Sequence, residues 1–498
     1  MIRNVTEYLD KTLLRFPDKV ALEDNNGTLT FSELHTMALN VAAKITKEWG
    51  KQRNKPIVVE MKKSKECIVA FLGIAYSGNF YCPLAANAPQ ERKEKILSVL
   101  KPIGFIGKRS EGMEESENSF TIEQAIEEAG CPETSLITKT DTDPLYVLFT
   151  SGSTGMPKGV VISHRSVVDY AEWLADEFAF DENTVFGNQA PFYFDNSILD
   201  IYSMLRNGSK MVIIPEEKFV LANAVMDYVQ QKEINTIFWV PSALIAVANA
   251  GVLKNYSTTC LQKVLFCGEV MPNKQLNMWR AAFPKLEYAN LYGPTEITDV
   301  CCFYRVNRSF QDDESLPIGE ACRNTEILVL NEKDELVQGQ EVGELCVKGT
   351  GLALGYYADE ERTKAVFIQN PLNHCYEEKL YRTGDLVYYN EYGEIMFVGR
   401  KDFQIKHQGN RIELGEIENA ILAQDGIENV CVVYNQEEQK IHAFYIGTKE
   451  EKEVYKALQA KLPRYMIPGK YHKVEEFPYN ANGKIDRKQL KQRYVKSK

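Results

Sequence analysis

Residues 145–164 read "LYVLFTSGSTGMPKGVVISH", an apolar run followed by a loop of Gly, Ser and Thr that contains a lysine. The run Leu145–Phe149 has the length and composition of a buried strand. Gly152 and Gly155 permit tight turns that point backbone amides at an anion. Pro157, however, stands where a Walker loop carries the glycine before its lysine, and proline has no N–H to donate. The stretch predicts either a phosphate-binding turn of another kind or a plain surface loop.

Strand and helix patterns alternate along most of the chain. Short apolar runs lie between helical patterns, which is typical of buried parallel strands in an α/β fold; such runs include residues 145–150, 210–215, 235–241 and 263–269. Residues 20–50 predict a strand pair that turns at "DNNG" and an amphipathic helix after Ser32. From about residue 343 the strands become shorter and rich in Gly and Tyr. We place a domain boundary at Lys401–Asp402, between residues 1–401 and residues 402–498.

Composition narrows the class of protein. The 498 residues are 44% hydrophobic and 26% charged, as in soluble globular proteins. A chain of this length is too long for one ordinary hydrophobic core, so we expect more than one domain. No apolar run approaches the roughly 18–20 residues that span a bilayer, so we expect no membrane insertion. A net charge of −11 argues against nucleic-acid binding. The eleven cysteines form no CxxC pair, which favours reduced thiols, a cytoplasmic location and no zinc site.

The full pattern TSGSTGxPKG closely resembles the loop of the adenylate-forming superfamily, which includes acyl-CoA synthetases, luciferases and the adenylation domains of peptide synthetases. These enzymes use ATP with Mg²⁺, and a substrate carboxylate attacks the α-phosphate with release of pyrophosphate. The resemblance implies a large N-terminal domain, made of α/β subdomains and a small β-barrel-like part, and a small mobile α+β C-terminal domain. It also implies that the β- and γ-phosphates contact the loop residues Thr150, Ser151, Gly152, Ser153, Thr154, Gly155 and Lys158.

Further landmarks of the superfamily follow in order. "NLYGPTE" (290–296) resembles its adenine and metal motif. The resemblance implies that Asn290 faces the adenine amino group, that Tyr292 stacks on the ring and that Glu296 holds Mg²⁺. Gly293 and Thr295 complete the nucleotide-binding motif, with Thr295 helping to hold the phosphates.

The second half of the chain carries the ribose and hinge motifs. "YRTGD" (381–385) places Asp385 where the superfamily binds both ribose hydroxyls. Arg400, in "GRKD", corresponds to a residue near the ribose and the α-phosphate, and Asp402 to the hinge. The superfamily often has tyrosine three residues before this arginine; here Phe397 keeps the apolar contact and loses the hydroxyl.

Lys484 lies in "NANGKIDRKQL", which resembles the catalytic lysine loop of the superfamily. The role requires a cation near the α-phosphate, where negative charge accumulates during attack. The alternative is an ordinary solvated lysine, one of 58 basic residues in the chain. The resemblance implies that Lys484, Arg400 and Asp402 form the catalytic set.

The segment "APFYFDNSILDIY" (190–202) bears on the substrate. Asp195 follows an aromatic cluster and precedes a helix pattern, so one interpretation is a helix N-cap. In amino-acid-activating members of the superfamily, an aspartate here accepts the α-ammonium group. A carboxylate in an apolar pocket is costly unless it is paired, and such a substrate supplies the pair.

Among amino-acid-activating members, the chain is most similar to the D-alanine–D-alanyl carrier protein ligases. Aligning motifs predicts a substrate pocket with Lys484 at the carboxylate and walls formed by Asp195, Asn196, Leu199, Phe238, Leu265, Cys267, Gly268, Leu291, Asp299 and Val300. Cys267 is alternatively a small buried hydrophobe. Asp299 and Asn196 replace residues that are usually apolar in these ligases, and if they face the pocket they indicate a polar or basic substrate side chain.

We therefore expect an AMP-forming ligase that activates an amino acid, with D-alanine as the leading substrate. The aminoacyl group would pass to the phosphopantetheine thiol of a separate carrier protein, because the sequence ends soon after the lysine loop. The alternatives are a peptide-synthetase-type enzyme for another small or polar amino acid, an acyl- or aryl-CoA synthetase, and an inactive scaffold.

Overall fold

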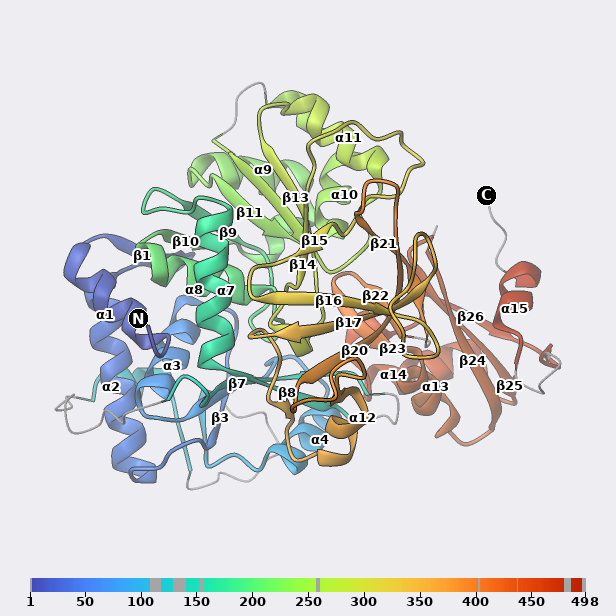
Figure 1. Ribbon diagram of the computed structural model, residues 1–498. Coiled ribbons are helices and arrows are strands. Elements are labelled where there is room, and N and C mark those ends of the chain that lie inside the picture. Colours follow the sequence, from blue (N-terminus) through green and yellow to red (C-terminus); the bar gives the residue numbers. More distant parts are fainter. Residues whose placement is uncertain are drawn as a thin grey trace. The chain divides into compact units, whose positions relative to one another are not determined.

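A nine-stranded sheet dominates the first half of the computed structural model (Figure 1), which describes residues 2–107, 118–128, 140–152, 156–256, 260–401, 404–436, 438–478 and 485–494. Six of its strands run parallel and the strands at either end are antiparallel. The strand order is β15 (Glu320–Ala321), β14 (Cys302–Arg305), β13 (Glu287–Tyr292), β12 (Lys263–Cys267), β11 (Thr236–Trp239), β9 (Val185–Asn188), β10 (Lys210–Ile213), β1 (Val20–Asp24) and β2 (Gly27–Thr30).

A seven-stranded sheet contains the apolar run that precedes the Gly/Ser/Thr loop. Its order is β18 (Gly355–Tyr356), β8 (Lys158–Ser163), β7 (Pro144–Thr150), β4 (Phe80–Pro83), β3 (Pro56–Glu60), β5 (Gly104–Gly107) and β6 (Ser119–Phe120). The residues of β3 are all buried, which explains why its first four residues, 56–59, are all apolar. The predicted α/β class is confirmed by these two sheets.

An antiparallel sheet follows, and the expectation of shorter strands here is wrong, because Lys379–Tyr389 forms one strand of 11 residues. It consists of β16 (Thr325–Leu330), β17 (Gly343–Gly349), β20 (Lys379–Tyr389), β19 (Phe367–Gln369) and β21 (Ile395–Arg400). Strands β20 and β21 pair so that Asp385 lies opposite Arg400. This register matters for the site because it brings two of the predicted nucleotide-binding side chains together.

Helices cover the sheets, and several begin with a side-chain cap. The helices before residue 400 are α1 (Thr6–Arg15), α2 (Phe31–Trp49), α3 (Lys65–Tyr76), α4 (Gln90–Leu100), α5 (Ile122–Ile126), α7 (His164–Glu177), α8 (Ser197–Asn207), α9 (Ala222–Gln231), α10 (Pro241–Asn249), α11 (Asn273–Ala282) and α12 (Glu360–Val366), with the 3₁₀ turns η1 (Glu216–Val220), η2 (Leu253–Asn255) and η3 (Thr295–Ile297). We expected the second helix after Ser32. It begins at Phe31 because Thr30 and Glu33 form a capping box.

The chain divides into two compact units. The first comprises Met1–Ala86, Leu100–Leu148 and Gly159–Lys401, and the second Asn87–Val99, Phe149–Lys158 and Asp402–Lys498. The second unit contains a hairpin, a three-stranded sheet and three helices of the C-terminal segment: β22 (Gln404–His407), β23 (Asn410–Glu413), α13 (Leu414–Leu422), β24 (Ile427–Asn435), β25 (Lys440–Gly447), α14 (Glu451–Gln459), η4 (Arg464–Met466), β26 (Lys470–Lys473) and α15 (Arg487–Tyr494).

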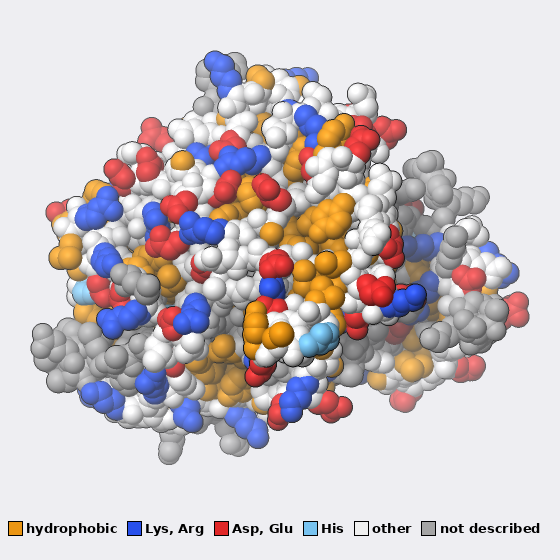
Figure 2. Space-filling view, in the orientation of Figure 1, with side chains coloured by type: hydrophobic (Ala, Val, Ile, Leu, Met, Phe, Trp, Pro, Cys, Tyr) orange, Lys and Arg blue, Asp and Glu red, His pale blue; other side chains and the backbone are white. Residues whose placement is uncertain are grey.

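The surface of the first unit mixes charges of both signs. Figure 2 shows acidic and basic side chains interspersed on the visible face, with hydrophobic side chains exposed between them. One exposed aromatic ring, that of Tyr392, is covered by the guanidinium of Arg308, which lies 4.7 Å from the ring centre and forms an ion pair with Glu394. Among the described residues, no helix is long and apolar enough to cross a membrane.

Candidate active site

Three neighbouring parallel strands supply the predicted apolar wall of the substrate pocket. Phe238 on β11 lies opposite Leu265 on β12, and Cys267 lies opposite Leu291 on β13. Alternate residues of a strand face opposite sides of its sheet. These four side chains join one hydrophobic core, and the residues between them join another: Ile237, Trp239, Val264 and Phe266. The structure therefore places the four predicted wall residues on one face, near the carboxyl ends of adjacent strands, where open α/β sheets bind ligands.

Asp195 lies just before α8, the helix that follows β9. Its carboxylate accepts a hydrogen bond from the hydroxyl of Thr295 at 2.5 Å and one from the backbone N–H of Asn196 at 3.1 Å. The N-cap of α8 is Asn196, without a side-chain cap. The N-cap interpretation of Asp195 is therefore not supported, because its side chain turns toward the "GPTE" turn. Leu199, one helical turn on, is fully buried.

Asp299 follows the same turn and is buried, with 2% of its surface exposed. Thr298 and Asp299 both have left-handed backbone conformations, with φ of 59° and 72°. Such conformations cost non-glycine residues about 1–3 kcal/mol each and are common at functional sites. The hydroxyl of Tyr170 on α7 donates to the Asp299 carboxylate at 2.7 Å. Val300 joins the core that contains Phe238 and Leu265.

Two glycines near this wall lie where the backbone conformation or a close contact leaves no space for a side chain. Gly268 follows Cys267 with φ of 103°, a conformation that only glycine adopts readily. A Cβ at Gly293 would lie 2.4 Å from the carbonyl oxygen of Asp299. The glycine of the "GPTE" motif thus permits the close approach that positions the Asp299 loop.

A polar cluster forms where the nucleotide-binding motifs meet. The Tyr292 hydroxyl donates to the Asp385 carboxylate, and the Arg400 guanidinium donates to its other oxygen at 2.6 Å. Burial and the charge of Asp385 raise the pKa of Tyr292 well above its ordinary value, so the phenol remains a donor. The rings of Tyr292 and Phe397 lie 6.4 Å apart. Four residues predicted from three separate motifs therefore lie together.

Asn290 and Glu296 belong to the same sequence motif as Tyr292, and both are buried. The Asn290 amide donates to the carbonyl of Pro317 at 2.8 Å. Glu296 is fully buried and accepts a hydrogen bond from the Tyr356 hydroxyl at 2.7 Å. Among the described residues, no group of three His, Cys, Asp or Glu could hold a metal ion. Because Mg²⁺ in nucleotide sites often takes one carboxylate together with substrate phosphates, a single buried carboxylate at Glu296 fits the ion.

The Gly/Ser/Thr loop belongs to the second unit. There the Ser151 hydroxyl donates to the carbonyl of Arg411 at 2.8 Å and accepts from the backbone N–H of Glu413 at 3.2 Å. Thr150 has a buried hydroxyl with no hydrogen-bond partner among the residues that the structure describes. Gly152 is buried and Lys158 is half-buried at the start of β8. Five predicted site residues lie outside the described ranges: Ser153, Thr154, Gly155, Asp402 and Lys484.

Two tyrosines that the motifs did not identify contact predicted site residues. Tyr170 donates a hydrogen bond to Asp299, and Tyr356 donates one to Glu296. Tyr146 lies in the apolar run before the loop, and its fully buried hydroxyl lacks a hydrogen-bond partner within the described part of the chain. Tyr170 and Tyr356 meet their carboxylates only through the fold, so short motifs give no signal for these contacts.

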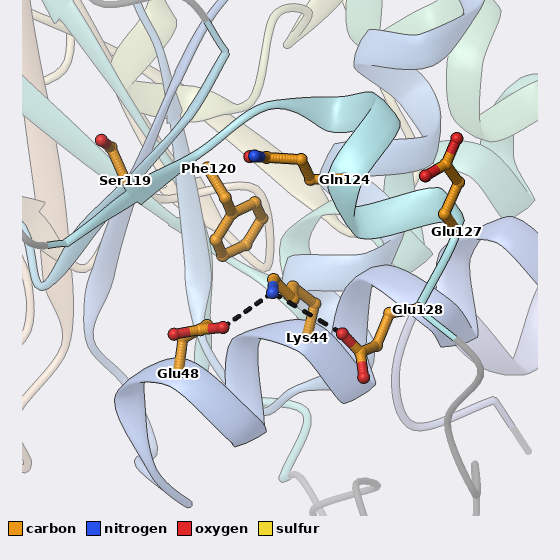
Figure 3. Close-up of a pocket in the computed structure, with 7 residues that line it drawn as sticks. All are labelled: Lys44, Glu48, Ser119, Phe120, Gln124, Glu127 and Glu128. Atoms are coloured by element: carbon orange, nitrogen blue, oxygen red, sulfur yellow. Dashed lines mark hydrogen bonds and ion pairs between the residues drawn. The ribbon is translucent and has the colours of Figure 1, made fainter.

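A separate surface pocket lies between α2 and α5 (Figure 3). It is lined by Lys44, Glu48, Ser119, Phe120, Gln124, Glu127 and Glu128. Lys44 lies between two carboxylates, 2.7 Å from Glu48 and 3.6 Å from Glu128. The hydrogen bond with Glu48 raises the pKa of Lys44. This pocket contains no predicted site residue, and its ion pairs are those of a charged surface.

Comparison with known proteins agrees with this geometry. Residues 9–357 match the family described as AMP-binding enzyme, and residues 416–484 match the AMP-binding enzyme C-terminal domain. The chain is 32% identical to the D-alanine–D-alanyl carrier protein ligase of Bacillus licheniformis, over 98% of each protein. It is 30% identical to tyrocidine synthase 1 of Brevibacillus parabrevis, over 98% of this chain and 45% of that protein, so it spans about half of that multidomain relative.

The fold is shared with solved structures of adenylation domains. The structure of the Vibrio cholerae adenylation domain AlmE in complex with glycyl-adenosine-5'-phosphate superposes with a TM-score of 0.85, at 21% identity over 99% of each chain. Both domain matches and the full-length identity lead to one conclusion: this chain is a member of the AMP-binding enzyme family, an adenylate-forming ligase of the type found in nonribosomal peptide synthetases.

Proposed function

We propose that the enzyme activates a small α-amino acid as its adenylate and transfers it to the phosphopantetheine thiol of a separate carrier protein. The observation that carries this proposal is the position of Asp195. Its carboxylate accepts a hydrogen bond from Thr295 beside the buried Glu296. This carboxylate is the acceptor that we propose for the ammonium group, and Phe238, Leu265 and Leu291, which belong to one hydrophobic core, are the side chains that we propose to limit the substrate's size. Fatty-acyl substrates have no group for such a carboxylate.

In the first half-reaction, a carboxylate oxygen of the amino acid forms a bond to the α-phosphorus of ATP. The bond from that phosphorus to the bridging oxygen breaks, and pyrophosphate leaves. Asp195 orients the amino acid through its ammonium group. Tyr292, Asp385 and Arg400 hold the nucleoside, and Lys484 neutralises the negative charge that grows at the phosphorus. Mg²⁺, held by Glu296, would supply positive charge to the phosphates.

In the second half-reaction, the carrier thiol attacks the carbonyl carbon of the adenylate and AMP leaves. We propose that residues 402–498 move as a domain about Asp402, withdrawing Lys484 and bringing the turn at Gly409 to the site. Gly409 has φ of 74° at the tip of the β22–β23 hairpin. The nucleophile comes from the carrier, so no protein cysteine is required. The ten described cysteines are free thiols, which supports a cytoplasmic location.

D-alanine is the first candidate substrate, because the full-length relative in Bacillus licheniformis is named for it. Another small, polar amino acid is the second candidate, favoured by the buried carboxylate of Asp299, which the motif alignment predicts in the pocket wall. An acyl- or aryl-CoA synthetase is a weaker alternative, since its substrate leaves Asp195 without a partner. A scaffold would have no need of the Tyr292, Asp385 and Arg400 cluster.

ATP–pyrophosphate exchange with a panel of D- and L-amino acids tests the proposal, with a fatty acid as control. We expect exchange with at least one small amino acid and none with the fatty acid. Exchange with the fatty acid alone would overturn the substrate class. Transfer is tested by incubating the enzyme with the radiolabelled amino acid and a phosphopantetheinylated carrier protein, where a labelled thioester is the expected product.

A further inference from the structure

The strand that carries Asp385 contains a bulge. Strands β17 and β20 pair regularly as far as Glu344 and again from Cys346. Between these two positions, Leu345 of β17 faces three residues of β20, of which Asp385 is the last. The middle one, Gly384, has φ of 75°, a conformation typical of glycine in bulges. Bulges bend a strand and often re-aim a side chain beside an active site, and here that side chain is the Asp385 carboxylate.

Glu344 binds this bulge through one oxygen of its carboxylate. Its Oε1 atom accepts a hydrogen bond from the backbone N–H of Gly384 at 3.0 Å. The carbonyl of Gly384 accepts in turn from the backbone N–H of Lys401 at 2.8 Å. A bulge takes backbone groups out of the regular ladder, and each of them then requires another partner. Glu344 supplies the acceptor for the amide at the centre of the bulge.

The other oxygen of Glu344 binds two cations. Its Oε2 atom accepts from the Arg382 guanidinium at 2.7 Å and from the Lys401 ammonium at 3.0 Å. The Glu344 side chain is 6% exposed, and a carboxylate so buried is stable as an ion only where it is paired. Lys401 directly follows β21 and is the last residue of the first unit. Glu344 therefore joins the bulge of β20 to the residue that follows β21.

Thr383 supports the same bulge from within the strand. Its hydroxyl donates to the carbonyl of Leu345 at 2.7 Å and accepts from the backbone N–H of Asp385 at 3.0 Å. Thr383 and Asp385 are both buried. The direction of a short side chain depends on its backbone, so the bulge decides that the Asp385 carboxylate meets Tyr292 and Arg400.

We propose that Glu344 is a positioning residue for the nucleotide, because it holds the bulge that aims the Asp385 carboxylate at the ribose hydroxyls. This inference rests on the proposed function, which assigns Asp385 to the nucleoside. Glu344 acts through the backbone, since its two oxygens bind Gly384, Arg382 and Lys401. Its loss should weaken the recognition of the ribose and leave the recognition of the amino acid unchanged.

Calorimetric titration of the full-length enzyme with ATP and with 2′-deoxy-ATP, each with Mg²⁺, tests this inference. The two nucleotides differ by one ribose hydroxyl, so the ratio of their Kd values reports on the contact with Asp385. The measurement needs no amino acid. We expect the wild-type enzyme to bind ATP at least about 10-fold more tightly, because a hydrogen bond to a charged group contributes a factor of about 10–100 in affinity.

Variants identify the residue responsible. Glu344→Gln keeps the size of the side chain but leaves one oxygen for three donors, so we expect the ratio of Kd values to fall at least about 5-fold. In pyrophosphate exchange the same variant should raise the KM for ATP and leave the KM for the amino acid unchanged. Thr383→Val keeps the shape of the side chain, removes the hydroxyl that binds Asp385 and should lower the same ratio. Glu326→Gln, on β16 with a side chain 58% exposed and paired with Lys348, is the matched control and should leave the ratio unchanged. Thermal unfolding should show that each variant is folded.

The outcomes separate this inference from the function. A wild-type ratio in both Glu344→Gln and Thr383→Val would overturn the positioning role. Weaker binding of both nucleotides by the same factor would also overturn it, because that result indicates a general loss of structure. Equal binding of the two nucleotides by the wild-type enzyme would overturn the ribose contact of Asp385 and this inference with it. If the ratios change as expected but no amino acid supports exchange, the proposed amino-acid activation is overturned and the positioning role stands.

Discussion

At the scale of single residues, the site depends on carboxylates that the fold pairs with hydroxyl groups. Asp195, Asp299, Glu296 and Asp385 each accept a hydrogen bond from a hydroxyl group: Thr295, Tyr170, Tyr356 and Tyr292 respectively. A hydroxyl group donates a hydrogen bond to a carboxylate without adding a positive charge. Asp385 also pairs with the guanidinium of Arg400.

Asp195 provides the first prediction at this scale. Asp195→Ala should abolish the selection of α-amino acids and lower amino-acid-dependent exchange at least about 100-fold, because the substrate ammonium loses its counter-charge. ATP–pyrophosphate exchange measures this loss, and fluorescence titration with ATP should show unchanged binding. Asp176→Asn, on α7 with a side chain 59% exposed, serves as the control. Unchanged amino-acid turnover in Asp195→Ala would contradict the pairing.

Lys484 provides the second prediction for a single residue. Lys484→Ala should lose at least 10²-fold in adenylation while still binding ATP, because a single transition-state donor is typically worth ~10²–10³ in rate. Single-turnover formation of the adenylate measures this effect. Lys473→Ala, whose ammonium pairs with Glu450 on the surface, is a matched lysine control. Wild-type exchange in Lys484→Ala would exclude the catalytic role.

At the scale of elements, the segment before α3 and α8, the helix after Asp195, each carry a titratable group with a shifted pKa, Lys63 and Asp200. Lys63 donates to the carbonyl of Gln189 at 2.9 Å, and Asn188 donates to Asp200 at 2.8 Å. Burial lowers the pKa of Lys63 to about 7. Burial also raises the pKa of Asp200 to about 7, although Asn188 and Lys63 oppose this shift. The charge of each group opposes the pKa shift that burial causes in the other.

This pair predicts a pH dependence of stability. Between about pH 4 and 7 the folded protein holds the Asp200 proton more tightly than the unfolded chain, so the free energy of unfolding falls as pH rises. From about pH 7 to 10 the unfolded chain holds the Lys63 proton more tightly, so the free energy of unfolding rises with pH. Each change has a limiting slope of about 1.4 kcal/mol per pH unit.

The double variant Lys63→Met/Asp200→Asn isolates this effect. Its unfolding free energy, measured in urea across pH 4–10, should lack the minimum near neutral pH that the pair gives the wild-type enzyme. The difference between the two curves is the quantity to compare, because other titrating groups contribute equally to both. A difference that does not vary with pH would contradict the shifted pKa values of the pair.

At the scale of the whole molecule, the proposed mechanism has one small domain serve two half-reactions. Asp402→Pro should separate them, because proline fixes φ at the proposed hinge and restricts the turning of residues 402–498. We expect the substitution to change the rate of pyrophosphate exchange and the rate of transfer to the carrier thiol by factors that differ at least about 10-fold. Thermal unfolding should show that the variant is folded. If both half-reactions of the variant kept their wild-type rates, a hinge at this residue would be excluded.

Much of the fold was predictable because its signals are local. Short apolar runs such as residues 56–59 in β3 and 264–267 in β12 indicated buried parallel strands, and the family comparison and the sheets confirm the α/β class. Helix starts were less accurate: α2 begins earlier than expected because Thr30 caps it through a contact with Glu33. A cap depends on one hydrogen bond, which hydrophobic periodicity does not reveal.

The sequence alone determined the family, the order of its motifs and the identity of the polar side chains, because these are carried by short contiguous stretches such as 149–158 and 290–296. Only the tertiary structure decided what each side chain meets. Asp299 and Tyr170 are 129 residues apart in sequence and share a hydrogen bond, and burial together with the charges of Asp195 and Asp299 raises the pKa of Tyr146. The physical reason is that the hydrogen bonds and electrostatic environment of a buried carboxylate depend on its neighbours in space. These neighbours come from β7, α7 and the turn after β13, which only the packed sheets bring together.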